Sequence, residues 1–353
     1  MADHDLATID NPSSALTDFT LIVDLSNMSA SWWSANDTAV GAKGRVFKAD
    51  GTTELASDWI DFDNGGETGF LRVKWSGTLA SSGTQELWIE PPLAANSTYG
   101  AADTYGSDNA YDASWEGYYP VFGDSSTTLT DRTVNGEDGT LQTGVTFSGD
   151  KLVHAASNEG VHLMDSDPLS GAAAFTIFIE ANFTNVDADR PLFYTGAHSG
   201  TGPIVFWGDA AATDWIAGLI TASGGTTNTQ NSNHVISAAT DYHYVLKWAG
   251  ADNMRLYVAG VEDTGSGFPD ASATGTLAAA PSGTYQIGAD QGHTRQMVGT
   301  IWNVQVHSAA RHDDWISEEY SQTNDNANFY TTWTWVPAAG GSPVASILQQ
   351  HAA

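Results

Sequence analysis

The chain has 353 residues, of which 41% are hydrophobic and 11% aromatic; this is enough apolar surface for folded cores and excludes a largely disordered protein. Its 42 Asp and Glu against 12 Lys and Arg give a formal net charge of −30, which repels phosphate backbones and argues against nucleic acid as a partner. Cysteine is absent, which excludes disulfides and thiolate metal sites, and no apolar run approaches the ~20 residues of a membrane span.

The first residues, MADHDLATIDNPSS, lack the basic and apolar regions of a secretory signal. We expect either that a signal has been removed or that the protein is made in the cytoplasm and released by assembly into a particle. Many of the acidic residues lie in turns, as in KADGTT and NGEDGT. They suit a solubilising surface in a salty environment, with cation binding by a few of them as the alternative.

Alternation of apolar and polar residues predicts strands throughout the first part of the chain. The predicted strands are DFTLIVDL (18–25), GRVFKA (44–49), SDWIDFD (57–63), GFLRVKW (69–75) and TQELWIEP (84–91). They suffice for one small β-sandwich. The stretch 95–117 has no sustained apolar periodicity and reads as a connector, so we place the first domain at residues 1–112.

The second part carries more strands than a small sandwich needs and predicts a large two-sheet jelly roll over residues 113–336. Its predicted strands are 117–123, 144–149, 161–165, 175–183, 191–196, 203–208, 215–221, 284–290, 299–307 and a hairpin within 241–263. In that hairpin Tyr242, Tyr244 and Trp248 share a face with Leu246, which favours core packing over sugar binding.

One helix is predicted near the end of the jelly roll. In ARHDDWISEEYSQTND (310–325), Asp313 or Asp314 can cap the N-terminus, and Trp315, Ile316 and Tyr320 fall on helical spacing. Residues 337–353 form a tail that is broken by Pro and Gly and contains one short apolar patch, SILQQ. It is either a free tail or an assembly contact.

Several blocks of the second part resemble the laminin-G-like, concanavalin A-like jelly roll. They are FTIFIEANF, YHYVLKWAGADNMRLYVAGVED, YQIGADQGHTRQMVGTIWNVQVHSAAR and DDWISEEYSQTNDNANFYT. In that family a strand ending in Trp precedes an LYVNG-like strand, and an IG…GTID…AR stretch and a short helix close the domain. This sequence departs from the family at two positions: Ala259 stands where Asn is usual, and Trp302 stands where an acidic residue often follows Ile301.

The first 112 residues resemble the small β-domain of unknown function that precedes such jelly rolls in bacterial, archaeal and phage surface proteins. The blocks TLIVDLSNM, RVFKADGTTELASDWIDFD and LRVKWSGTLASSGTQELWIEPP carry this resemblance. Together the two resemblances imply an all-β chain of two β-sandwich domains, the second a concanavalin A-like jelly roll with one short C-terminal helix.

Catalytic motifs are not found. Laminarinase-like hydrolases of this superfamily use an E-x-D-x-x-E pattern, because a retaining mechanism needs two carboxylates ~5–5.5 Å apart, and no Glu of this chain forms it. There is no G-x-S-x-G, H-E-x-x-H or phosphate-binding loop. The sequence therefore favours a protein that is not an enzyme.

Binding residues are sought beside turns, where a side chain need not fill the core. The candidate glycan-binding residues are Trp207, Asp209, Asp214, Trp215 and His198. The candidate Ca²⁺ ligands are the carboxylate pairs Asp187 with Asp189 and Asp165 with Asp167, since Ca²⁺ takes six to eight oxygen ligands. No other cofactor is predicted.

We expect a non-enzymatic surface protein of a bacteriophage virion, either a capsid decoration or a tail adhesin. It would be a homo-oligomer that contacts other capsid or tail proteins, with the C-terminal tail as one route, and it would bind glycans of a host surface or the environment. The alternative is a secreted or cell-surface carbohydrate-binding module of a halophilic or marine microbe. A glucanase-like hydrolase is the third hypothesis.

Overall fold

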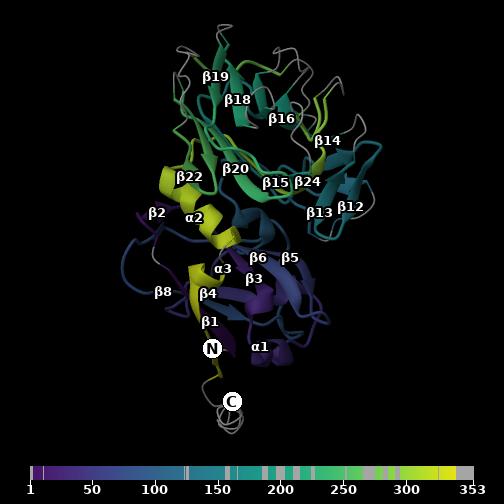
Figure 1. Ribbon diagram of the computed structural model, residues 1–353. Helices are drawn as coiled ribbons and strands as arrows, with labels where there is room; N and C mark the ends of the chain where they lie inside the picture. Colours follow the sequence, from purple (N-terminus) through teal and green to yellow (C-terminus); the bar gives the residue numbers. More distant parts are fainter. Residues whose placement is uncertain are drawn as a thin grey trace. The chain divides into compact units, whose positions relative to one another are not determined.

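The computed structural model describes residues 3–10, 12–122, 124, 127–155, 160–164, 166–184, 190–195, 203–209, 215–223, 227–250, 253–264, 275–280, 285–290, 295–324 and 326–338. Contacts divide the chain into two compact units (Figure 1). Unit 1 is formed by Met1–Asp112 together with Ser321–Ala353, and unit 2 by Ala113–Tyr320. The fold is all-β, as predicted, with antiparallel pairing throughout the described strands.

Unit 1 holds three small sheets. A four-stranded sheet has the order β25-β1-β8-β4, from Tyr330–Val336, His4–Ile9, Gln85–Glu90 and Arg45–Lys48. A three-stranded sheet has the order β3-β6-β5, from Thr20–Asp24, Thr68–Lys74 and Ser57–Asp63, and a two-stranded one pairs β2 (Leu16–Thr17) with β7 (Thr78–Leu79). Residues 330–336, which we expected in the jelly roll, thus form the partner strand of β1 in unit 1.

Short helices link the strands of unit 1. They are α1 (Ala30–Ala35), α3 (Asn326–Phe329) and the 3₁₀ turns η1 (Leu25–Asn27), η2 (Gly41–Lys43) and η3 (Ser107–Ala110). Helix α1 was not predicted, although Ser29 is a favourable N-cap: its hydroxyl accepts from Trp32 N. The buried Asp5 carboxylate accepts from the backbone N and the hydroxyl of Ser29 and so fixes the start of the helix.

Unit 2 is a jelly roll of two large sheets. The first, called here the front sheet, runs β10 (Thr128–Leu129), β11 (Gly139–Leu141), β14 (Val161–Met164), β23 (Tyr285–Ile287), β16 (Arg190–Thr195), β17 (Ile204–Asp209), β18 (Trp215–Thr221), β19 (Thr227–Asn231). The second, the back sheet, runs β12 (Val145–Ser148), β13 (Lys151–His154), β24 (Gly299–His307), β15 (Phe175–Phe183), β20 (Asp241–Trp248), β21 (Met254–Val258), β22 (Val261–Glu262), with β9 (Trp115–Pro120) also pairing with β24.

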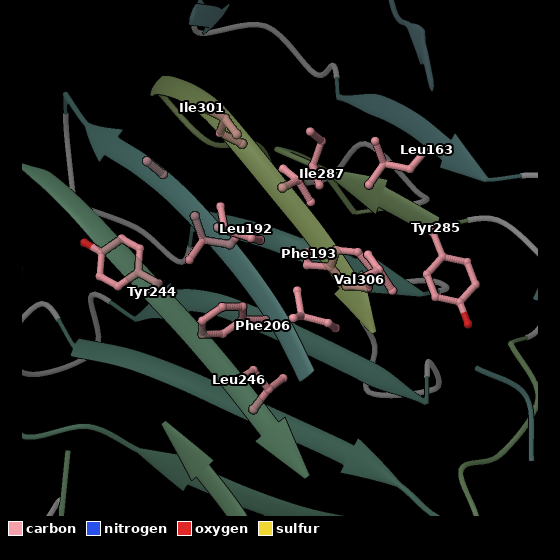
Figure 2. Packing of buried hydrophobic residues seen from close by; sticks show 14 of the residues in the cluster. Leu163, Leu192, Phe193, Phe206, Tyr244, Leu246, Tyr285, Ile287, Ile301 and Val306 are labelled. Atoms are coloured by element: carbon pink, nitrogen blue, oxygen red, sulfur yellow. The ribbon is translucent and has the colours of Figure 1, made fainter. Parts of the chain in front are cut away.

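Apolar side chains of the two sheets fill one core, shown in Figure 2. Tyr244 and Leu246 from β20 and Ile301 and Val306 from β24 supply the back-sheet side of that core, and all four are fully buried. They pack with the front-sheet side chains Leu163, Leu192, Phe193, Phe206, Tyr285 and Ile287. The predicted hairpin pairs Leu246 with Leu256, and its aromatic face is core, as predicted.

Helix α2 (Asp313–Asn324) confirms the predicted C-terminal helix. Trp315 and Ile316 are buried in unit 2, and Tyr320 packs against the β21–β22 turn, where a Cβ on Gly260 would come within 2.9 Å of Tyr320 Cβ. The residues from Ser321 onward belong to unit 1. Of the predicted tail, Pro337 and Ala338 are described, and Ala338 N donates to the Asp3 carboxylate; residues 339–353, which include SILQQ, lie outside the described residues.

None of the helices in the described ranges is both long enough and apolar enough to cross a bilayer.

Candidate functional site

The strand register brings six side chains into one row across the front sheet. The outer row, as we call it, consists of Thr140, His162, Gln286, Tyr194, Val205 and Leu219, each the Cα partner of the next. Their strand neighbours, such as Leu163, Ile287 and Phe206, belong to the core. Because side chains alternate between the two faces of a strand, the row lies on the face of the front sheet that is turned away from the core.

Gln286 is the most unusual member of the outer row. Its side chain is 1% exposed, and its amide Nε2 lies 2.7 Å from His162 Nε2. The Gln286 Oε1 atom is buried and has no hydrogen-bond partner among the residues that the structure describes. An unpaired buried acceptor costs ~1–3 kcal/mol, and buried polar atoms are usually bonded. The outer row therefore contains a hydrogen-bonding position that the described part of the chain leaves unused.

Aromatic and apolar side chains follow this amide across the next two strands, β16 and β17. Tyr194 is the Cα partner of Gln286 and is fully buried, and Val205 follows it at 4% exposure. Trp207 alternates with the core residue Phe206 on β17 and is half-buried, with Pro191 and Ala217 as its Cα partners. Ring faces beside amide and imidazole groups are the combination that binds the C–H and O–H groups of a sugar.

The structure describes some of the predicted glycan-binding residues and not others. Trp207 lies on β17, close to the outer row. Asp209 and Trp215 are Cα partners on β17 and β18, so the backbone brings these two predictions together, although their side chains are outside the described part of the structure. Asp214 and His198 also lie outside the described residues.

Of the predicted calcium ligands, only Asp167 is described. Its carboxylate accepts from the Tyr285 hydroxyl at 2.5 Å and from Ala280 N at 2.6 Å. Burial, and then this hydrogen bond, raise the pKa of the Tyr285 phenol well above its usual range, so the phenol stays a donor. Asp165, Asp187 and Asp189 lie outside the described residues. Within the ranges that are described, no group of three or more His, Asp or Glu side chains could hold a metal ion, and the Ca²⁺ site stays a prediction.

The buried carboxylate of Asp131, which follows β10, has a structural role. Asp131 is 6% exposed, and its carboxylate accepts from the backbone N of Tyr118, Thr133 and Glu137 and from the Thr133 hydroxyl. Burial raises the pKa of this carboxyl in spite of the four donors. Since its oxygens are bonded to the chain, Asp131 serves the loop between β10 and β11 rather than a ligand.

Sequence reasoning missed Tyr194, Gln286 and His162 as neighbours. In TYQIG the polar Gln286 stands between the apolar residues Tyr285 and Ile287, and this alternation indicates that Gln286 faces outward from the strand. That signal could have selected Gln286, but the juxtaposition with Tyr194 and His162 depends on the pairing of β23 with β16 and β14, which are far apart in the sequence.

Residues 156–317 match the sequence model of a family described as the concanavalin A-like lectin/glucanases superfamily. This confirms the resemblance inferred for the C-terminal part of the chain. No match was found among curated protein sequences.

Three of the solved structures to which this chain is similar are the following. The botulinum neurotoxin serotype D binding domain is 10% identical, with a TM-score of 0.45 over 59% of this chain and 51% of that chain. The binding domain of Paraclostridial Mosquitocidal Protein 1 is 10% identical, with a TM-score of 0.46 over 60% and 52%. Trypanosoma rangeli sialidase is 12% identical, with a TM-score of 0.46 over 76% and 44%. This chain thus spans about half the length of each.

Proposed function

Starting from the match of residues 156–317 to the concanavalin A-like lectin/glucanases superfamily, we propose that this chain is a non-enzymatic surface protein that binds saccharides through the front sheet of its jelly roll. The observation that carries the proposal is the buried Gln286 Oε1, which has no partner among the described residues, in a row with Tyr194 and on the same sheet face as the half-buried Trp207, two strands away. Because Gln286 and Tyr194 are almost fully buried, binding requires a local opening over them; a sugar hydroxyl would then supply the missing donor, and the half-buried Trp207 ring would cover the apolar face of the sugar.

The charge of the chain indicates the class of saccharide. At a formal net charge of −30, the protein repels sialylated, sulphated and uronic acid-rich glycans, and this repulsion is strongest at low salt. The ligand is therefore a neutral saccharide. Single sites of this kind bind weakly, and display in many copies raises the overall avidity by 10²–10⁴.

Display on a bacteriophage virion, as a capsid decoration or a tail adhesin, is the setting that we propose for these copies. It is supported by the resemblance of the first 112 residues to the β-domain of phage and microbial surface proteins and by a fold that needs no disulfide, since the chain has no Cys. A secreted or cell-surface carbohydrate-binding module would share this chemistry. Antibody labelling distinguishes the two settings: a virion protein is labelled on purified particles, and a cell-surface module is labelled on cell envelopes.

The saccharide site is tested on an array of neutral glycans with the full chain. We expect wild type to be retained and Trp207→Ala to lose about tenfold in affinity, which corresponds to about 1.4 kcal/mol. Gln286→Leu, which removes both amide atoms, should lose binding as well. Trp302→Ala is the matched control, because Trp302 is half-buried on β24 of the back sheet and should leave binding unchanged.

Two results would count against the saccharide proposal. One is the absence of retention on any neutral glycan; the other is an equal loss in Trp207→Ala and Trp302→Ala, which would indicate general destabilisation. Repeating the array with a chelator tests the predicted Ca²⁺ requirement. Incubation with β-glucans should release no reducing ends, and their release would revive the glucanase hypothesis.

A further inference from the structure

We propose that the free edge of β25 is a self-association surface, through which two copies of the chain pair their C-terminal strands antiparallel. β25 pairs with β1 on one side and, in the part of the chain that the structure describes, with no strand on the other. Such an edge presents unpaired N–H and C=O groups to another chain. The inference is independent of the saccharide site, because it concerns unit 1 alone.

The other long edges of unit 1 are protected. Strand β4 carries Arg45 and Lys48, and β5 carries three Asp and a bulge after Ile60; charged residues and bulges are the usual defences of an edge. The edge of β3 is covered by side chains: Gln322 accepts from Ile22 N at 2.8 Å and donates to Thr20 O at 2.9 Å, and Asn326 donates to Ile22 O at 3.2 Å.

Strand β25 has none of these defences along Thr332–Val336. The sequence T-W-T-W-V contains no charge and no Pro, and its register with β1 is continuous from Thr332 to Val336, since the irregularity lies before Thr332. Trp333 and Trp335 are half-buried and Thr334 is exposed. An added strand would cover the remaining exposed surface of both Trp rings.

A second copy fits this edge because the segment is self-complementary. If two β25 strands pair about a twofold axis at Thr334, Thr332 faces Val336 of the other copy and Trp333 faces Trp335, so each pair occurs twice. Aromatic and β-branched cross-strand pairs are favourable in sheets. The net charge also favours pairing at β25. Two molecules of net charge −30 repel each other least where neither strand carries an acidic side chain.

Unit 2 has two competing uncharged edges of more than two residues among the described strands, β12 (Val145–Ser148) and β19 (Thr227–Asn231). The apolar side chains of β12, Val145 and Phe147, already pack on the core of unit 2, so β19 is the one to compare. It reads T-N-T-Q-N and offers no apolar side chain whose burial would stabilise a dimer. We therefore assign self-association to β25 rather than to β19.

The absence of cysteine permits a direct test, because one introduced thiol can form only an intermolecular disulfide. Directly opposed residues of an antiparallel pair have Cα atoms ~4.5–5.5 Å apart, within the range that a disulfide spans. We expect full-length Thr334→Cys to form a covalent dimer under mild oxidation. Thr78→Cys, at a position on β7 that is also exposed, should stay monomeric on a non-reducing gel.

Analytical ultracentrifugation completes the test. Wild type should sediment as a dimer, and Thr334→Lys, which sets two ammonium groups against each other at the axis, should weaken the dimer at least tenfold. Thr78→Lys should not, and circular dichroism melting checks that both variants are folded. A monomeric wild type, crosslinking of Thr334→Cys no greater than that of Thr78→Cys, or a Thr334→Lys dimer of unchanged strength would each overturn the proposal.

Discussion

His243 is a histidine kept neutral inside the protein. It is 1% exposed, and neither ring nitrogen has a hydrogen-bond partner among the described residues. Its ring centroid lies 5.6 Å from those of Phe178 and Tyr320. Burial lowers the pKa of His243 to about 4, although the nearby Glu319 acts in the opposite direction. Between this value and the ordinary pKa of about 6.5, the unfolded chain binds more protons than the folded chain.

Stability should therefore be complete above about pH 6.5 and fall as the pH decreases towards 4. The loss from this one group is at most about 3 kcal/mol. Urea unfolding of wild type and of His243→Phe at a series of pH values measures it, because Phe fits among the neighbouring rings and cannot titrate. The free energy of unfolding should decrease more steeply in wild type than in the variant, and parallel curves would show that His243 does not titrate in this way.

Single residues also mark how far the candidate site could be predicted. Trp207 was predicted because it stands beside a turn in FWGD, where an aromatic side chain is not needed by the core. The unpaired oxygen of Gln286 depends on which atoms of other strands approach the amide. No pattern within one strand contains that information, so Gln286 and its neighbours Tyr194 and His162 were not selected.

At the scale of elements, the amide side chains of Gln322, in the last turn of α2, and of Asn326, in α3, replace a missing strand beside β3. Gln322 Oε1 and Nε2 pair with the β3 backbone as a neighbouring strand would. Gln322→Met keeps the length of the side chain and removes both bonds, leaving Ile22 N and Thr20 O without these partners. We expect unit 1 to lose about 2–3 kcal/mol. Urea unfolding measures this, with Gln85→Met, a half-buried position on β8, as the control that should change little.

Most elements could be predicted because their apolar residues repeat with the period of a strand or a helix. The strand FTIFIEANF and the helix around Trp315 are found where the pattern predicts them. Ending the jelly roll at residue 336 was wrong, and no strand was predicted over 330–336. The segment YTTWTWV is a strand that belongs to unit 1. Its pairing with β1 links the two ends of the described chain, and pairing over such a separation leaves no local signal.

At the scale of the whole molecule, charge should make stability depend on salt. With a net charge of −30, self-repulsion destabilises the folded state, and it is screened as the Debye length falls from ~10 Å at 0.1 M to ~3 Å at 1 M salt. We expect the melting temperature to rise with NaCl, by about 2–4 °C for each kcal/mol of repulsion removed. Near pH 4.2, the isoelectric point of the sequence, the rise should vanish; a salt effect of equal size there would mean that charge is not its cause.

The pairing of β1 with β25 has a consequence for biosynthesis. Because domains fold largely as units while the chain emerges, the jelly roll, whose residues run without interruption from Ala113 to Tyr320, can be complete while its companion still lacks a strand. The ribosome makes Ile9 roughly 320 residues before Tyr330, which at 5–20 residues per second is a wait of about 16 to 64 seconds. During that time the edge of β1 that β25 will occupy is unpaired on the nascent chain, open to chaperones and to neighbouring polypeptides, and unit 1 can close only after β25 has been made.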